Sequence, residues 1–277
     1  MKKILTFLLL LAAAGRVSAQ QRPQYTQYMI NGYLLNPALS GIEDYTDVKL
    51  GTRQQWVGLE GAPQTYHLSA HTPLGKQAAT VRGKGPTGTR TVQANRFARP
   101  YAHHGVGLMA ARDRTGPLRR TNLKLSYAYH LPLTRGITMS MGASAGALRN
   151  SLNAAEATFA NPADPAISSD YVNRTYLDLG LGTWIYSDRF FVGLSGQQLL
   201  KGKRELNPSE ANGTNGVLQR HYYATAGYKL RLTPEVALIP SVMAKFASPS
   251  PAALDLNLKA AFGDRVWAGL SLSLIHI

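Results

Sequence analysis

Three short stretches of the chain carry side chains that could take part in chemistry. His67 and His71 flank Ser69, and a second histidine pair occupies positions 103 and 104. A serine beside a histidine can act as a nucleophile with its base, and histidines also bind metal ions. Residues 83–88 read Gly-Lys-Gly-Pro-Thr-Gly and resemble a phosphate-binding loop.

The spacing of these residues argues against a catalytic or metal site. On a strand, residues two apart share a face at about 6.6 Å, and residues four apart lie about 13 Å from each other. Ser69 therefore needs a histidine from another strand, and His67 and His71 cannot hold one metal ion unaided. The glycine-rich run lacks the required Gly-Lys-Ser/Thr order and opens no helix. We expect no catalytic residue, no metal and no cofactor, which makes a hydrolase the weakest interpretation.

The first residues have the features of a secretory signal. Lys2 and Lys3 precede an apolar run at 4–14, and Val-Ser-Ala at 17–19 offers small residues for cleavage. The run is too short to span a bilayer, and no second one follows. Residues 1–19 are therefore predicted to be a cleaved signal peptide. The chain has no cysteine, which excludes disulfides, thiolate metal sites and a lipid-modified N-terminal cysteine.

The chain is strongly basic. Its formal charge of +15 falls to +12 when Lys2, Lys3 and Arg16 leave with the signal. No recognition helix, zinc spacing or aromatic RNA motif accompanies this charge, so no nucleic-acid partner is expected. An exported basic protein instead meets anionic lipid head groups and polysaccharide.

Most of the remaining chain alternates apolar and polar residues with the period of a β-strand. In residues 123–131 the positions of Leu125 and Tyr127 alternate with those of Lys124 and Ser126. One face of such a strand suits lipid, and the other suits a hydrated lumen in which charged groups stay solvated. The predicted strands are 48–56, 65–74, 105–112, 123–131, 137–147, 175–186, 190–199, 219–230, 235–246, 254–260 and 266–274.

The connections between these segments alternate in length. The gaps at 132–136, 187–189, 231–234 and 263–265 are tight, whereas those at 113–120, 150–174 and 200–218 are longer. The gap at 247–251 is grouped with the longer set by its place in the alternation. Outer-membrane barrels place tight turns at the periplasmic rim and long loops outside. The sequence therefore predicts an all-β protein, a transmembrane antiparallel β-barrel of the outer membrane.

The barrel is expected to occupy residues 45–277, with a basic loop at 75–104 inserted between its second and third strands. Residues 20–44 precede it as an ordered periplasmic segment with turn chemistry at Asn36 and Pro37. Eleven strands leave the last one running outward without a terminal aromatic residue, whereas bacterial barrels normally have an even number. We therefore expect about 12 to 14 strands in a complete protein, with one or more C-terminal strands missing from this chain.

The chain contains Gln-Tyr-Thr-Gln-Tyr at 24–28, Leu-Asn-Pro-Ala at 35–38 and Arg-Gln-Gln-Trp at 53–56. These motifs resemble those of the PorP/SprF family of Bacteroidetes outer-membrane proteins. The specific part lies in the first sixty mature residues, and weaker matches continue at 105–107, 113–117 and 178–182. The basic loop at 75–104 looks longer than the usual connection of the family. The residues that carry the resemblance, and that are candidates for partner docking, are Gln24, Tyr25, Gln27, Tyr28, Asn36, Pro37, Gly41, Arg53, Gln55 and Trp56.

The resemblance implies a non-enzymatic component of the type IX secretion system, with a role in gliding motility in some members. Its implied partners are periplasmic ring components, a peptidoglycan-binding subunit and secreted cargo with a C-terminal sorting domain, besides outer-membrane lipid. The alternative is a general porin or small-solute channel, which would share the barrel but not the N-terminal motifs.

Overall fold

The protein consists of β-strands that follow one another along the chain. The computed structural model describes residues 30–76, 101–153, 171–200, 219–247, 250–262 and 266–275. Each of the eleven predicted segments overlaps a strand of this structure. The strands are β1 (Asp47–Gln54), β2 (Gln64–Leu74), β3 (His103–Thr115), β4 (Leu118–Pro132), β5 (Ile137–Asn153), β6 (Tyr171–Ser187), β7 (Phe190–Gln197), β8 (His221–Tyr228), β9 (Leu230–Arg231), β10 (Val236–Ala247), β11 (Ser250–Phe262) and β12 (Val266–Ile275).

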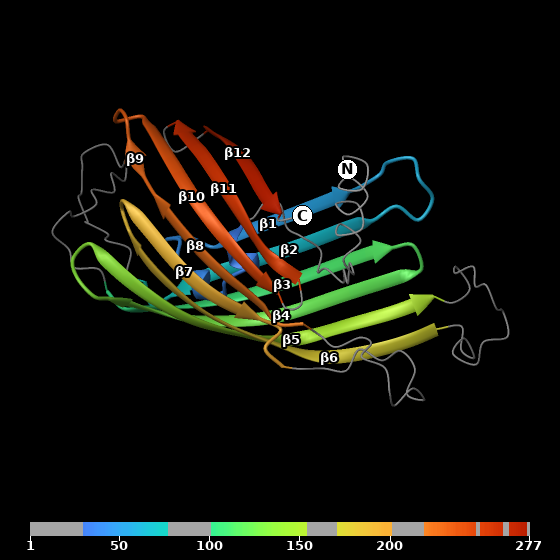
Figure 1. Ribbon diagram of the computed structural model, residues 1–277. Coiled ribbons are helices and arrows are strands. Elements are labelled where there is room, and N and C mark those ends of the chain that lie inside the picture. Colours follow the sequence, from blue (N-terminus) through green and yellow to red (C-terminus); the bar gives the residue numbers. More distant parts are fainter. Residues whose placement is uncertain are drawn as a thin grey trace, which may run out of the picture.

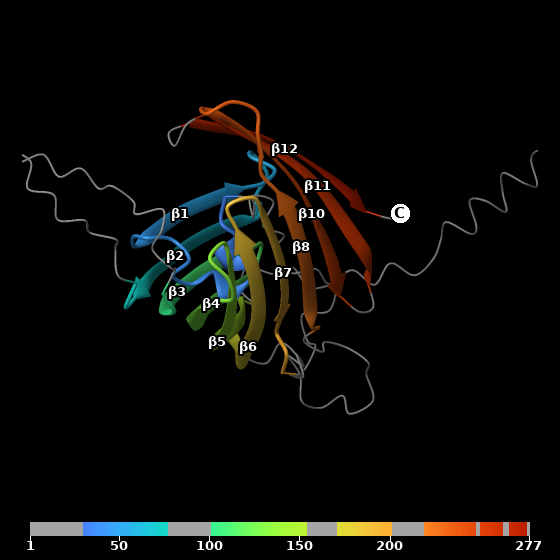
Figure 2. The ribbon, with the colours of Figure 1, turned by 90° about the vertical axis from the view of Figure 1, so that its left-hand side faces the viewer.

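The strands form one antiparallel sheet in which sequence neighbours pair with each other. The short strand β9 follows β8 after one residue and pairs with β10. The sheet is strongly curved, as Figures 1 and 2 show, and β1 and β12 are its two edges. The arrangement is that of a barrel wall that is not closed between these edges, and it confirms the predicted all-β class. Whether further strands join the two edges stays a prediction.

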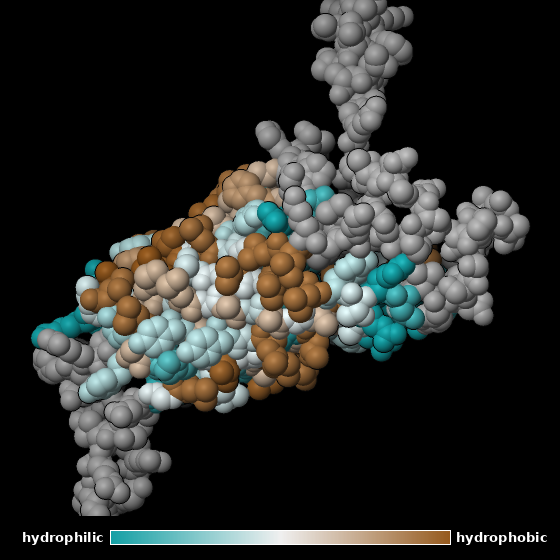
Figure 3. All heavy atoms as spheres, turned by 90° about the horizontal axis from the view of Figure 1, so that it is seen from below, coloured by the Kyte–Doolittle hydropathy of each residue, from teal (hydrophilic) through white to brown (hydrophobic). Residues whose placement is uncertain are grey.

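The pleat of the sheet separates an apolar convex face from a polar concave face. On β4, Leu123, Leu125 and Tyr127 are exposed, whereas Lys124 and Ser126 between them are buried. The space-filling view in Figure 3 shows apolar side chains spread over the middle of the outer surface. This is the predicted alternation of a barrel strand, with the apolar side turned outward.

Some strands extend beyond their predicted ends. Residues 113–120 were expected to form a long connection, but only Gly116 and Pro117 lie between β3 and β4. The expected longer connection at 247–251 is also wrong, because β10 ends at Ala247 and β11 begins at Ser250. The 103–104 histidine pair was placed in the basic loop, yet both residues begin β3, where they pair with Tyr129 and His130 of β4. Polar residues at a barrel rim continue the ladder in water, so apolar periodicity alone underestimates strand length. The rest of the basic loop, at 77–100, and the predicted signal peptide at 1–19 lie outside the described residues.

The described part of the chain contains no helix with the length and hydrophobicity of a membrane span. Two single-turn 3-10 helices precede the sheet, η1 (Gly32–Leu34) and η2 (Pro37–Leu39). They lie on the concave side of the sheet, which curves around them in Figure 2.

Candidate functional site

Residues 31–41 form a compact segment against the concave face, which we call the plug. Asn36 takes an extended conformation, and its side-chain Oδ1 accepts a hydrogen bond from the backbone N–H of Ala38 at 3.0 Å. Pro37 occupies the first position of η2, where its missing N–H is not needed. The Asn-Pro pair thus sets the turn that the sequence predicted at this position.

The apolar side chains of the plug are buried against inward-facing residues of the sheet. Leu34 and Leu39 belong to a cluster with Met109 of β3. Leu35 packs instead against Met243 of β10. The plug therefore contacts opposite walls of the curved sheet, and burial of these side chains contributes to holding it in place.

Hydrogen bonds also join the plug backbone and side chains to the middle strands. Asn36 Nδ2 donates to the backbone oxygens of Thr183 and Leu194, at 3.0 and 3.3 Å. The carbonyl of Leu35 accepts from Ser195 Oγ at 2.8 Å and from Gln197 Nε2 at 3.0 Å.

The beginning of the plug and η2 make similar contacts. Asn31 Nδ2 donates to Ser69 Oγ at 2.6 Å, and the hydroxyl of Tyr33 lies 2.7 Å from Ser126 Oγ. Ser140 Oγ donates to the Ala38 carbonyl at 2.7 Å. Side chains of the sheet on β2, β4, β5 and β7 thus form hydrogen bonds with this one segment.

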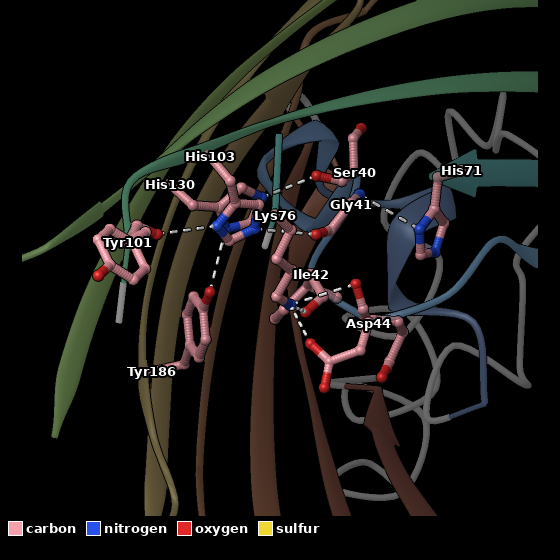
Figure 4. Close-up of polar contacts among 11 residues, drawn as sticks. Ser40, Gly41, Ile42, Asp44, His71, Lys76, Tyr101, His103, His130 and Tyr186 are labelled. Carbon is pink, nitrogen blue, oxygen red and sulfur yellow. Dashed lines mark hydrogen bonds and ion pairs between the residues drawn. The ribbon is translucent and has the colours of Figure 1, made fainter. Parts of the chain in front are cut away.

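Three histidines hold the last residues of the plug, as Figure 4 shows. His130 Nε2 donates to the Ser40 carbonyl at 2.8 Å, and His103 Nε2 donates to the Gly41 carbonyl at 3.1 Å. The rings of these two histidines are stacked, with centroids 4.3 Å apart. His71 Nδ1 accepts from the Gly41 N–H at 3.3 Å. Since a carbonyl only accepts, the contacts with Ser40 and Gly41 require a proton on Nε2 of His130 and of His103, and the Gly41 N–H requires an unprotonated Nδ1 on His71.

Glycines in the wall make room for the plug backbone. A Cβ atom on Gly105 would lie 1.8 Å from the Ser40 carbonyl oxygen, and one on Gly142 would lie 2.5 Å from the Ala38 nitrogen. A Cβ on Gly182 would lie 2.0 Å from Asn36 Oδ1. No side chain fits at such distances, so the plug and these three strands are shaped to each other.

The chain leaves the plug through an acidic turn that Lys76 holds. Its ammonium group donates to the carbonyls of Ile42 and Glu43 and pairs with Asp44 at 2.6 Å (Figure 4). The Asp44 side chain is exposed, so this ion pair contributes little by itself. The neighbouring carboxylate of Glu43 raises the pKa of Tyr45 above its ordinary value.

Charged side chains on the concave face are paired rather than individually solvated. Lys124 lies 2.8 Å from Asp178 and donates to Gln197 Oε1 at 2.7 Å. Asp255 pairs with Lys245 and accepts from Ser273 Oγ at 2.5 Å. The expectation of a hydrated lumen that solvates each charge is therefore wrong for these groups, because the plug and the neighbouring strands bury them.

The sequence-predicted site residues fall into separate regions. Asn36, Pro37 and Gly41 come together in the plug and are buried. Arg53 is the second-to-last residue of β1, and Gln55 and Trp56 follow the strand, away from the plug contacts described above. Trp56 is 68% exposed and has a positive φ of 49°. Gln24, Tyr25, Gln27 and Tyr28 lie outside the described residues.

Of the histidine and serine positions singled out at first, Ser69, His71 and His103 contact the plug. Ser69 accepts the hydrogen bond from Asn31, and His71 accepts the one from Gly41. Within the described residues, no group of three His, Cys, Asp or Glu side chains could hold a metal ion. Sequence reasoning missed His103 and His130 as plug contacts, since nothing local marks a residue whose partner is far along the chain.

Comparison with known proteins agrees with this architecture. The family model described as type IX secretion system membrane protein PorP/SprF matches residues 17–274. The chain belongs to the PorP/SprF family. No curated protein matches it by sequence. As a PorP/SprF protein the chain is a type IX secretion membrane protein, and a curved antiparallel sheet with an apolar convex face fits an outer membrane.

Proposed function

We propose that this PorP/SprF protein is a non-enzymatic outer-membrane component of type IX secretion that docks other parts of the machinery. Its signal sequence would direct residues 20–277 across the inner membrane, and the apolar convex face would anchor the sheet in the outer membrane. The proposed partners are periplasmic ring components, a peptidoglycan-binding subunit and cargo with a C-terminal sorting domain. Support of gliding is a further proposal of the same kind.

The observation that carries this proposal is the seated plug. Tyr28 precedes Asn31 by three residues, which is at most about 11 Å of extended chain. The aromatic motif at 24–28 is therefore tethered directly to a segment fixed by many contacts. A fixed tether reduces the entropy that a docking peptide loses on binding. In this proposal Asn36, Pro37 and Gly41 position the motif, and the motif contacts the partner.

The turn after β1 offers a second docking surface. Trp56, Val57 and Leu59 are exposed there, at the rim of the sheet to which β1 runs. Exposed aromatic and apolar residues at a loop tip suit contact with another protein. If the tight turns mark the periplasmic side, this turn faces outward, so we assign it to cargo rather than to the periplasmic ring.

The plug also bears on the porin alternative. A solute channel requires a continuous aqueous path, whereas the plug occupies the concave side and leaves beside it a cavity of about 230 Å³ lined by residues such as Leu35, Trp184 and Met243. We therefore favour the docking role.

The docking proposal is tested by replacing Tyr25 and Tyr28 together with alanine in the full-length protein. We expect unchanged heat-modifiable migration, loss of cargo export and loss of ring proteins from a pull-down. The matched control replaces Tyr222 and Tyr228, two exposed tyrosines of β8, which should leave export intact. Normal export with normal partner recovery in the Tyr25/Tyr28 variant would refute the docking role. Ion conductance of the wild-type protein in planar bilayers would then favour a porin.

A further inference from the structure

Arginines gather on the convex face where β3, β4 and β5 reach one rim. Arg112 and Arg149 both stand opposite Thr121, one from each side, so the three residues form one cross-strand row. One row further along, Arg114 of β3 stands directly opposite Arg119 of β4. Figure 3 shows hydrophilic side chains gathered at the right-hand end of the molecule.

The arginine rows begin where the apolar surface ends. The next row inward contains only apolar residues, and rows two residues apart on a strand are about 7 Å apart. Lipid head groups lie at this level of a barrel, just beyond its apolar band. The members of the apolar row, in order of pairing, are Leu50, Leu68, Ala110, Leu123 and Ala147.

A groove on the outer surface leads to these arginines. It has a volume of about 570 Å³, and its lining includes Leu50, Tyr66, Leu68 and Ala110. Arg112 and Thr121 line it as well, next to this apolar part. The groove arises because Ala110 is small beside the larger neighbours in its row. An elongated apolar chain lying here would place its polar end beside the guanidinium of Arg112.

The charge arrangement favours an anion at this polar end. One strand, β4, lies between Arg112 and Arg149, so these residues are two strand spacings or about 10 Å apart, with Thr121 between them. An anion bound between Arg112 and Arg149 is attracted by both guanidinium groups. Guanidinium forms two parallel hydrogen bonds with a phosphate, which makes arginine well suited to it.

We propose that this face binds an anionic phospholipid, with its phosphate on Arg112 and Arg149 and an acyl chain in the groove. A nucleic acid or polysaccharide would use the arginines but not the apolar groove beside them. The site is independent of the secretion role, because it faces the bilayer and not the plug. It would fix the height and rotation of the sheet in the membrane.

The test measures retention of phosphatidylglycerol by the purified full-length protein with native mass spectrometry. Each arginine at an anionic lipid surface contributes about fivefold to binding, so Arg112→Gln with Arg149→Gln should lower retention about 25-fold. Arg135→Gln with Arg189→Gln removes the same charge from turns between β4 and β5 and between β6 and β7, and should change it little. Phosphatidylethanolamine should be retained weakly by all forms.

Three outcomes would overturn the proposal. The first is unchanged retention in the Arg112/Arg149 variant, and the second is an equal loss in the Arg135/Arg189 control. The third is displacement of the lipid by millimolar inorganic phosphate, which would indicate a free-anion site. Arg112→Lys with Arg149→Lys keeps the charge and should recover part of the retention, and unchanged heat-modifiable migration shows that each variant is folded.

Discussion

Replacement of Gly105 by alanine should unseat the plug while leaving strand β3 in place. The added Cβ would lie 1.8 Å from the Ser40 carbonyl oxygen and 3.0 Å from the Gly41 Cα, and both are backbone atoms that no rotamer change can move. β3 is held along its whole length by ladders to β2 and β4. The backbone of Ser40 and Gly41 is instead held by hydrogen bonds to histidine side chains of the sheet, so we expect the plug to move and β3 to stay.

The cost follows from the contacts that Ser40 and Gly41 would lose. Their backbone groups make three hydrogen bonds with the three histidines of the wall, and Ser40 Oγ makes a fourth with Ser126 Oγ at 2.8 Å. At about 1 kcal/mol net for each bond, the docked state loses on the order of 4 kcal/mol. This corresponds to roughly a 1000-fold shift toward the undocked state.

Amide hydrogen exchange over residues 38–41 measures this shift directly. We expect protection there to fall by up to the same 1000-fold in Gly105→Ala, while the amides of β3 and β4 stay protected. Gly136→Ala is the matched control, because a Cβ at that turn meets no atom within 4 Å. Unchanged protection of the plug in Gly105→Ala would refute the close fit between plug and wall, and lost protection throughout β3 would show that the strand yields instead.

Three further predictions follow from the wall and its pleat. Lys124→Met leaves a fully buried carboxylate without its ammonium partner, so urea unfolding should show a loss of about 3 to 5 kcal/mol, less if the carboxylate is also neutralised. Leu125→Arg places a charge against lipid and should lower the free energy of unfolding by about 2 to 4 kcal/mol. Ser126→Arg should lower it less but should displace the hydroxyls of Tyr33 and Ser40 that contact Ser126. Equal losses in both variants, without a loss of amide protection in the plug, would contradict the assigned pleat. A tag at Asn212 should be labelled on intact cells and a tag at Thr233 only after the outer membrane is opened; labelling of Thr233 on intact cells would reverse the assignment of the two rims.

The wall was predictable because its information is local. The alternation of Leu123, Leu125 and Tyr127 with Lys124 and Ser126 fixes which side of β4 faces lipid, and the structure confirms it. The exact ends of the strands were harder to predict. At 113–120 Leu118 is the one large apolar side chain, so periodicity gave no signal although the backbone ladder continues to a two-residue turn.

The plug was only partly predictable, because its contacts join residues far apart in the chain. Asn36 and Pro37 indicated an ordered turn by themselves. Nothing in the sequence indicated that the Ser40 carbonyl would meet His130, 90 residues further on. The glycines of the sheet did not indicate the plug either, because a glycine in a strand can mark a bulge, a bend or a close approach of another backbone. Pairing of Lys124 with Asp178 likewise required the register of two non-adjacent strands.

The central claim is that residues 31–41 are seated on the concave face in the membrane-inserted protein. The chain has no cysteine, so a crosslink formed after two cysteines are introduced can come from that pair alone. Asn31→Cys with Ser69→Cys joins two positions whose side chains form a 2.6 Å hydrogen bond, and Ala70→Cys in place of Ser69→Cys is the control, because residue 70 lies on the opposite face of β2. The account predicts that a short bis-maleimide crosslinks the 31/69 pair in cells and leaves the 31/70 pair open. Failure of the 31/69 pair to crosslink, or equal crosslinking of both pairs, would contradict it.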